Sequence, residues 1–136
     1  IEGAANSQER FGHALAAGEV DGDTFGDLVI CAPYGGPGHD PGNGYETGAG
    51  VARLYLGNTT QNLPSTLQPD HADAAFLGEF AAQLTHVGER FCSSVNMSVD
   101  ADGNGRPELI VGAPGWDGPS NGEVGKAYVF INPYSP

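Results

Sequence analysis

The sequence is poor in positive charge. Five Lys and Arg residues stand against 17 Asp and Glu residues, which gives a formal net charge of -12 at pH 7. A surface of that sign repels the phosphates of nucleic acids and anionic lipid headgroups. The sequence also contains no run of about 18 apolar residues, the length that spans a bilayer. We therefore expect neither a nucleic-acid partner nor insertion into a membrane.

Residues that carry reactive groups are few as well. The 2 cysteines lack the CxxC spacing of zinc and redox sites, and they are too few for a disulfide scaffold. The histidines, His13, His39, His71 and His86, lie in no recognisable nucleophile motif. We therefore expect that the chain is not an enzyme.

Glycine and proline, by contrast, are abundant, with 22 and 10 residues. The hydrophobic residues make up 39% of the chain and occur in short clusters rich in Val, Ile, Leu, Tyr and Phe. Turn residues bound these clusters, a pattern typical of short strands joined by tight turns. With 136 residues, the chain is short enough for one domain. The composition thus predicts an all-β protein.

An internal repeat organises the chain. Glu-Arg-Phe begins at Glu9 and again at Glu89, 80 residues later, and each time an acidic run and an apolar segment ending in Ala-Pro follow. A later apolar segment around Tyr55 returns around Tyr128, 73 residues on. Elements in one order at nearly constant spacing indicate a repeated structural unit. We divide the chain into a first repeat with an N-terminal strand (1–68), a connecting insertion (69–88) and a second repeat (89–136).

Each repeat is expected to form a four-stranded antiparallel unit. The expected strands are 11–17, 28–32, 51–56 and 65–68 in the first copy, and 94–99, 109–111 and 124–129 in the second. Between the copies, Phe76, Phe80 and Leu84 recur at four-residue spacing, which predicts a helix over 73–84 within the connecting insertion.

Two acidic loops carry a metal-binding pattern. The second places oxygen ligands at positions one, three, five and nine, namely Asp100, Asp102, Asn104 and Glu108, with glycine at position six. Position seven adds the backbone carbonyl of Arg106. Ca²⁺ prefers about six to eight oxygens, which such a loop directs toward one point. Strands are expected on both sides and position twelve offers no side-chain oxygen, so this is a hairpin-mounted calcium loop rather than an EF-hand.

The first loop repeats this pattern at the same positions. Its ligands would be Glu19, Asp21, Asp23, Asp27 and the carbonyl of Phe25. Thr24 stands where the second loop has glycine, so we expect its turn to be made differently, through Gly22 or Gly26. The alternative is that both loops are polar turns whose side chains bond their own backbone. Two loops in register, each followed by the same strand, favour two calcium sites.

Together these motifs resemble the FG-GAP repeat, the calcium-binding blade unit of the integrin alpha-chain propeller and of many bacterial surface proteins. The resemblance rests on Phe11-Gly12, both acidic loops and Gly112-Ala113-Pro114, and it covers almost the whole chain. It implies β-propeller blades with calcium on their loops, an extracellular or cell-surface location, and a role in adhesion or assembly without a catalytic centre. The alternatives are a calcium-dependent carbohydrate-binding, lectin-like module and the propeller fragment of a larger hydrolase.

Two departures from the family pattern involve cysteine. Cys31 and Cys92 each replace a glycine of the family motifs, and paired replacements imply a disulfide between neighbouring strands of adjacent blades. The alternative is two separate buried thiols. A bridge would indicate an oxidising compartment. In such a compartment Asn58 and Asn96, which begin Asn-x-Ser/Thr sequons, are candidate glycosylation sites.

Two repeats are too few to close a propeller, which has about four to eight blades. We therefore expect an incomplete propeller that associates with copies of itself or with further blades, and that binds a protein or glycan ligand. The segment Ile1 to Gln8 would be a spare strand, and its donation to the open edge near 127–131 of the next chain would build a ring or a filament. The alternatives are closure by the chain's own N-terminus and a longer parent chain that carries the missing blades.

Overall fold

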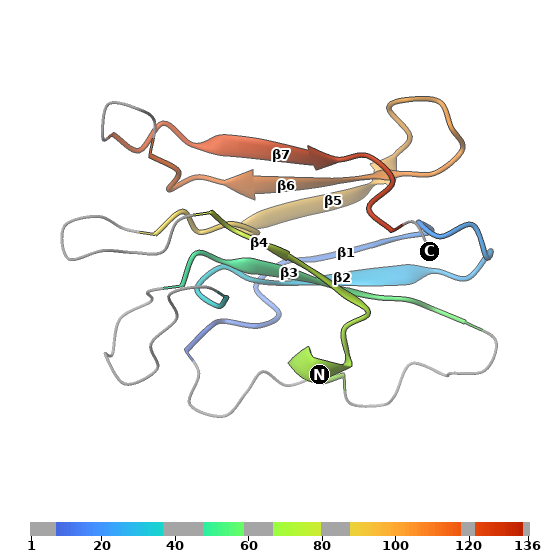
Figure 1. The fold of residues 1–136 in the computed structure, drawn as a ribbon, viewed down its shortest axis with the longest axis horizontal. Helices are drawn as coiled ribbons and strands as arrows, with labels where there is room; N and C mark the ends of the chain where they lie inside the picture. The colour runs from blue at the N-terminus through green and yellow to red at the C-terminus, as the bar shows by residue number, and fades with distance from the viewer. Residues whose placement is uncertain (1–7, 37–47, 59–66, 80–87, 118–121, 135–136) are drawn as a thin grey trace.

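The fold consists of two antiparallel sheets. The computed structural model of the chain describes residues 8–36, 48–58, 67–79, 88–117 and 122–134. In these ranges the first sheet has the strand order β1 (Leu15–Gly18), β2 (Asp27–Ala32), β3 (Val51–Tyr55), β4 (Ala74–Leu77). The second has the order β5 (Ser94–Val99), β6 (Glu108–Ala113), β7 (Lys126–Phe130). Figure 1 shows the sheets one above the other, with their strands running along the long axis of the molecule.

This arrangement confirms the all-β prediction of two blade-like sheets. The second sheet has three strands in the described part of the chain, not the four expected of a complete blade. The only other regular element there is a short 3₁₀ helix, η1 (Pro69–His71). None of the described residues belongs to a helix long and apolar enough to cross a membrane.

The end of the first repeat differs from the prediction. Residues 67 and 68 of the expected fourth strand are not in a strand, and residues 65 and 66 lie outside the described residues. The fourth strand is β4, inside the segment predicted to be a helix, so that prediction is wrong for residues 74–77. Pairing with β3, from Val51 opposite Leu77 to Leu54 opposite Ala74, satisfies the backbone groups at the edge of β3. Residues 80–84 of the predicted helix lie outside the described residues.

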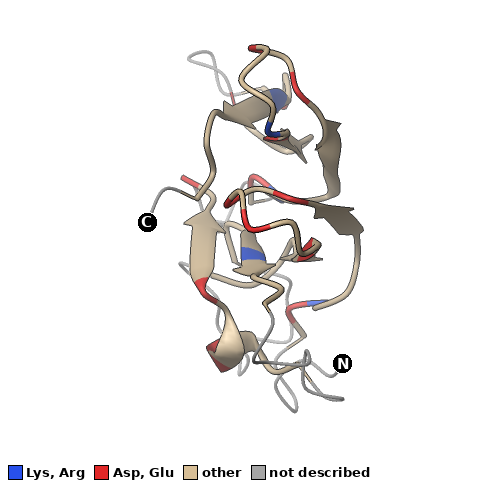
Figure 2. Ribbon diagram, turned by 90° about the vertical axis from the view of Figure 1, so that its right-hand side faces the viewer, with Lys and Arg blue, Asp and Glu red and all other residues tan. Residues whose placement is uncertain are grey.

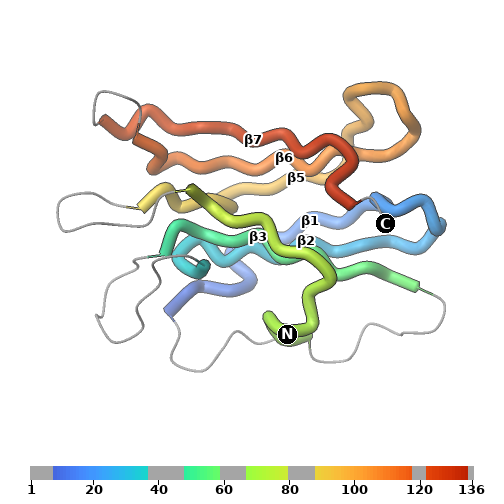
Figure 3. The backbone as a smooth tube through the Cα atoms, in the orientation of Figure 1, coloured from blue at the N-terminus to red at the C-terminus, as the bar shows by residue number. Residues whose placement is uncertain are grey.

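The main hydrophobic core lies between the two sheets. Side chains from alternate positions of both sheets meet there, and the fully buried members include Val29, Cys31, Leu54, Phe91, Met97, Leu109 and Val111. Aromatic rings extend this core: the centroids of Phe76 on β4 and Phe130 on β7 lie 4.7 Å apart. Figure 3 shows the backbones of the two sheets running alongside each other. The strand period of two thus places one face of each sheet against the other.

The two sheets approach closely where β1 and β5 lie side by side. A Cβ built on Gly18, the last residue of β1, would lie 2.2 Å from the carbonyl oxygen of Met97 on β5. No side chain fits at that separation, so glycine is required at position 18. The close approach brings the chain that follows β1 next to the chain that follows β5.

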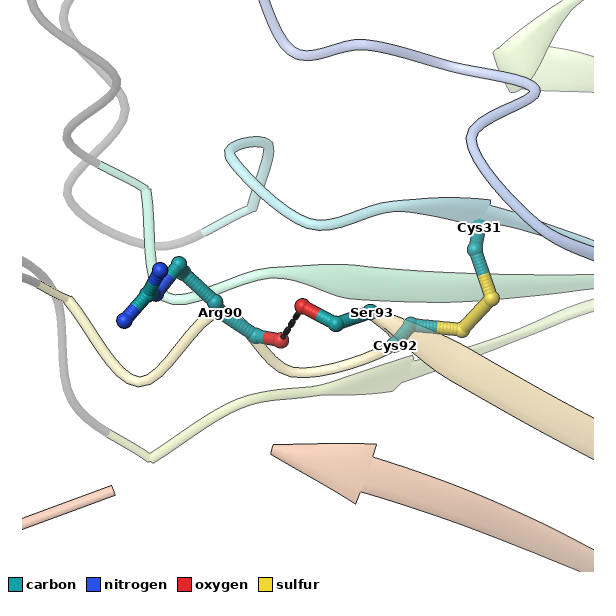
Figure 4. The surroundings of a disulfide bond; sticks show 4 residues. All are labelled: Cys31, Arg90, Cys92 and Ser93. Carbon is teal, nitrogen blue, oxygen red and sulfur yellow. Dashed lines mark hydrogen bonds between the residues drawn. A yellow bond between two sulfur atoms is a disulfide. The ribbon is translucent and has the colours of Figure 1, made fainter. Parts of the chain in front are cut away.

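A disulfide joins the sheets at the other end of the core. Cys31 on β2 and Cys92, just before β5, are bridged, with their Cα atoms 5.3 Å apart (Figure 4). Both residues are fully buried. Cys92 has φ 68° and Gly12, its counterpart in the first repeat, has φ 90°, so the cysteine occupies a left-handed position that favours glycine. The structure thus contains the bridge that the paired glycine replacements predict.

Two acidic loops as candidate metal sites

The two acidic loops lie at the same end of the molecule. Loop 1 (19–26) connects β1 to β2, and loop 2 (100–107) connects β5 to β6. Since β1 and β5 pack side by side, the two loops leave the sheets as neighbours, at the right of Figure 1. In Figure 2 the ribbon is red at Asp and Glu residues, and both loops carry red stretches. The fold therefore concentrates negative charge at one end of the paired sheets.

At loop 2 three carboxylates converge, two from the loop and one from Glu108, the first residue of β6. One oxygen each of Asp100, Asp102 and Glu108 lies within 4.8 Å of the other two. The Glu108 side chain is only 1% exposed. One of its oxygens, Oε2, accepts a hydrogen bond from the Ala101 amide, whereas Oε1 is buried without a hydrogen-bond partner. A buried, unpartnered carboxylate oxygen beside two other carboxylates is unfavourable unless a cation completes the group.

The backbone of loop 2 is tightly wound around its first residue. The Asp100 carboxylate accepts hydrogen bonds from the amides of Gly103 (2.8 Å), Asn104 (3.0 Å) and Gly105 (2.9 Å). Asn104 uses its amide oxygen to accept from the Arg106 amide at 2.8 Å and its nitrogen to donate to Asp102 at 2.9 Å. The polar-turn description is therefore correct as far as the backbone is concerned. It leaves Glu108 Oε1 without a partner.

Loop 1 holds a similar group of three carboxylates. One oxygen each of Glu19, Asp21 and Asp23 lies within 4.8 Å of the other two. Thr24 adopts φ 75°, close to the 89° of its counterpart Gly105, and Gly22 also has a positive φ of 88°. The expectation that the turn at Thr24 must be made differently is therefore wrong, because the threonine itself takes the left-handed conformation. The two loops follow nearly the same path.

The two loops differ in the hydrogen bonds of their last acid, which is Asp27 after loop 1 and Glu108 after loop 2. Asp27 is 1% exposed, and its two oxygens accept hydrogen bonds from the amides of Val20 (2.7 Å) and Gly57 (3.0 Å). Burial raises the pKa of the Asp27 carboxyl, and these two amide hydrogen bonds oppose the rise. Asp27 is not a member of the group formed by the other loop 1 acids. In the structure Asp27 ties loop 1 to the chain after β3, and its role as a ligand equivalent to Glu108 stays a prediction.

The remaining predicted ligands lie on the same loops. Phe25 follows Asp23, whose carboxylate accepts from the Phe25 amide at 2.7 Å, and the Phe25 side chain is 39% exposed. Arg106 lies between Asn104 and Glu108, with its side chain half-buried. The carbonyl ligation assigned to Phe25 and Arg106 stays a prediction.

Sequence reasoning missed two buried acids that support the sheets. Glu9 is 5% exposed and its carboxylate lies 3.2 Å from the guanidinium of Arg53 on β3. Glu89, 1% exposed, accepts hydrogen bonds from the Tyr128 hydroxyl and from the Glu79 amide. Burial, and then the contact with Glu89, raise the pKa of Tyr128. The sequence signal that could have revealed them is the glutamate that begins both Glu-Arg-Phe motifs. In the structure each of these acids anchors the segment before the first strand of its sheet.

The two sequons lie in different settings. Asn96 is on β5 with an exposed side chain, and its amide oxygen accepts from both the backbone amide and the hydroxyl of Ser98 at 3.1 Å. Asn58 lies three residues after β3 ends and is half-buried. Glycosylation of either residue stays a prediction.

Known proteins are similar to this chain in sequence. The family model of the FG-GAP repeat matches residues 11–52 and 94–130, segments that contain both acidic loops. The chain is 35% identical over 109 residues to integrin alpha-IIb of Homo sapiens, an alignment that covers 78% of this chain and 8% of that protein. It is 35% identical over 111 residues to integrin alpha-V of Gallus gallus, covering 79% and 9%. It is 34% identical over 129 residues to integrin alpha-PS2 of Drosophila melanogaster, covering 94% and 8%.

The chain thus spans less than a tenth of the length of these relatives. The family match, by contrast, includes more than half of the chain and falls on both repeats. The chain belongs to the FG-GAP repeat family.

Proposed function

We propose that this chain is a calcium-binding, non-enzymatic module of an extracellular adhesion or assembly protein. One observation carries the calcium assignment: Glu108 Oε1 is buried without a partner beside Asp100 and Asp102. Carboxylate oxygens are hard ligands, and a cation that takes six to eight oxygens suits a loop that also offers amide and carbonyl oxygens. Asp100, Asp102 and Glu108 would hold the ion in loop 2, and Glu19, Asp21 and Asp23 would hold one in loop 1.

The extracellular location is supported by the bridge between Cys31 and Cys92, because disulfides persist in oxidising compartments. The relatives named as integrin alpha chains support adhesion as the role. A lectin-like function has less support, because a cationic side chain already lies over each of the two rings considered for stacking on a sugar, Tyr34 and Trp116. The Arg10 guanidinium lies over the Tyr34 ring at 5.0 Å, and the Lys126 ammonium over the Trp116 ring at 5.1 Å.

Calcium is expected to stabilise the metal-free protein, because an ion that binds only the folded state adds stability by mass action. We expect dissociation constants of about 10⁻⁴ to 10⁻³ M, the range of extracellular modules. Isothermal calorimetry on the chelator-treated chain, with thermal unfolding in parallel, measures both quantities. Mg²⁺ is the matched control, since it demands a smaller octahedral shell and should stabilise the chain less. No heat and no thermal shift at millimolar calcium would contradict the assignment.

The module is also proposed to associate with further blades or with copies of itself. Its support is the edge of the second sheet: in the described part of the chain, β7 pairs only with β6. Near that edge, Val129 is 57% and Ile131 60% exposed. A strand from another chain would pair the backbone groups of β7 and cover these side chains.

Deleting residues 1–8 is expected to abolish self-association and to leave calcium binding unchanged, if this segment is the donated strand. Residues 1–7 of this segment lie outside the described residues. Sedimentation of the full and shortened chains, each with calcium and with chelator, gives the mass of both. A shortened chain that associates as the full chain does would assign the contact to another segment.

A further inference from the structure

The side chain of Arg106 crosses from loop 2 to loop 1. A Cβ built on Gly22 of loop 1 would lie 2.5 Å from Nη2 and 3.1 Å from Cζ of Arg106. The guanidinium therefore lies directly on the backbone of the other loop. Residues 101–105 of loop 2 are exposed, whereas Arg106 is half-buried, as this contact requires.

Two glycines make this contact possible. Gly18 allows β1 to approach β5, because its Cβ would meet the Met97 carbonyl oxygen at 2.2 Å. Gly22 leaves room for the guanidinium and adopts φ 88°, a conformation that side chains disfavour. The contact thus depends on the packing of the two repeats and is not a property of either loop alone.

The guanidinium lies on Gly22, which stands between Asp21 and Asp23 in the sequence, and it pairs with neither carboxylate. Among the described residues, Arg106 forms no ion pair with a carboxylate. The oxygens of Glu19, Asp21 and Asp23 accept hydrogen bonds from backbone amides of loop 1 and from no arginine nitrogen, so the charge of Arg106 offsets part of their mutual repulsion without occupying them. Loop 2 has no equivalent, because the residue of loop 1 that corresponds to Arg106 is the uncharged Phe25.

We propose that Arg106 is a built-in counter-cation that sets the calcium affinity of loop 1. This proposal rests on the proposed function of the loops. The guanidinium stabilises loop 1 when it is empty and repels a divalent cation that enters it. Arg106 is thus a positioning residue for its own loop, through its backbone, and an electrostatic regulator of the neighbouring loop, through its side chain.

The proposal predicts that removing the charge tightens loop 1. A unit charge about 6 to 10 Å from a divalent ion, in a largely aqueous setting, changes its affinity roughly three- to tenfold. Arg106→Gln is therefore expected to lower the calcium dissociation constant of loop 1 by roughly that factor, whereas Arg106→Lys should leave it near the wild-type value. The difference between Arg106→Gln and wild type should shrink as salt is raised from about 0.01 to 1 M, because salt screens charge.

Calorimetric titration of the full chain with CaCl₂ tests this. Arg10→Gln is the matched control, because it removes the same charge from an exposed residue before β1, at the opposite end of the strand from loop 1, and it should leave the loop 1 constant unchanged. Repeating the titrations in an Asp21→Asn, Asp23→Asn background shows whether the tighter binding belongs to loop 1. In that background the tighter dissociation constant should no longer be seen. Salt-dependent tightening in Arg106→Gln alone supports the proposal.

The other outcomes are distinct. Calcium uptake by the wild type with a loop 1 constant that Arg106→Gln leaves unchanged or weakens would overturn this inference and leave the proposed function standing. Equal tightening in Arg10→Gln would also overturn it, because net charge would then be the cause. No calcium uptake by any variant would overturn the proposed function and this inference together.

Discussion

Replacing Cys31 and Cys92 by alanine is expected to lower the free energy of unfolding by about 4 kcal/mol. The bridge joins residues that are 61 apart in the sequence, and the chain-entropy model assigns roughly that stabilisation to a closed loop of this length. Both cysteines belong to the core between the sheets, so alanine at the two positions keeps the site apolar while it removes the bond. Urea unfolding of the oxidised wild type and the double variant measures the difference.

A second pair of substitutions separates the bond from the backbone. Cys92 adopts φ 68°, which glycine tolerates and alanine does not, so the Cys31→Ala, Cys92→Gly variant should be about 1 kcal/mol more stable than the double-alanine variant. Reduced wild type should resemble the double-alanine variant. A double-alanine variant as stable as the oxidised wild type would show that packing between the sheets, and not the bridge, holds the repeats together.

The strands that carry the loops could be predicted because they have strong local signals. Strand β5 falls at 94–99 as predicted, and β2 and β6 extend the predicted ranges by one to a few residues. Each has β-branched or large apolar side chains and lies between turn residues. Strand β4 has the composition Ala-Ala-Phe-Leu, which fits a helix as well as a strand. Its conformation is decided by the edge of β3, a partner about twenty residues away, which local periodicity does not register.

The bridge was predictable for a different reason. At two positions of the repeat, one copy has glycine and the other has cysteine. Cys31 lies in the first copy and Cys92 in the second, so the pair is visible only when the whole chain is compared. The structure adds the cause of the original glycine: Gly12 and Cys92 share a positive φ. Cys92 keeps the positive φ of its glycine counterpart while its sulfur is bridged to Cys31.

The acidic loops were predictable in position but not in chemistry. Spacing alone makes Asp27 and Glu108 equivalent, yet Asp27 accepts a hydrogen bond from Gly57, thirty residues away, and Glu108 Oε1 has no such donor. The longer glutamate side chain and the path of the chain after β3 decide which carboxylate stays available. The contact of Arg106 with Gly22 likewise depends on how two repeats pack. Sequence spacing predicts which side chains of a loop could be ligands, whereas their availability depends on neighbouring segments.

Glu108→Gln is expected to stabilise the metal-free protein and to remove the stabilisation by calcium that loop 2 provides. Glutamine keeps an oxygen for the Ala101 amide, and its nitrogen can donate to Asp100 or Asp102, so the buried unpartnered oxygen and the repulsion are both relieved. Relief of one unsatisfied buried group is worth about 1 to 3 kcal/mol. At free calcium about a hundredfold above the loop 2 dissociation constant, the wild type should gain about 2.7 kcal/mol from this site. A variant that binds about a hundredfold more weakly would gain only about 0.4 kcal/mol.

Asp27→Asn is the matched control, since it makes the same chemical change at the same position of loop 1. Both Asp27 oxygens accept from backbone amides, and an asparagine would place its own N–H groups against one of these donors. We therefore expect Asp27→Asn to destabilise the metal-free protein by about 1 to 3 kcal/mol, the opposite sign to Glu108→Gln. Urea unfolding of the wild type and of both variants, each with chelator and with calcium, measures these differences. If Glu108→Gln instead destabilised the metal-free chain while calcium still stabilised it as in the wild type, Glu108 would be a structural residue like Asp27, and the metal assignment for loop 2 would fail.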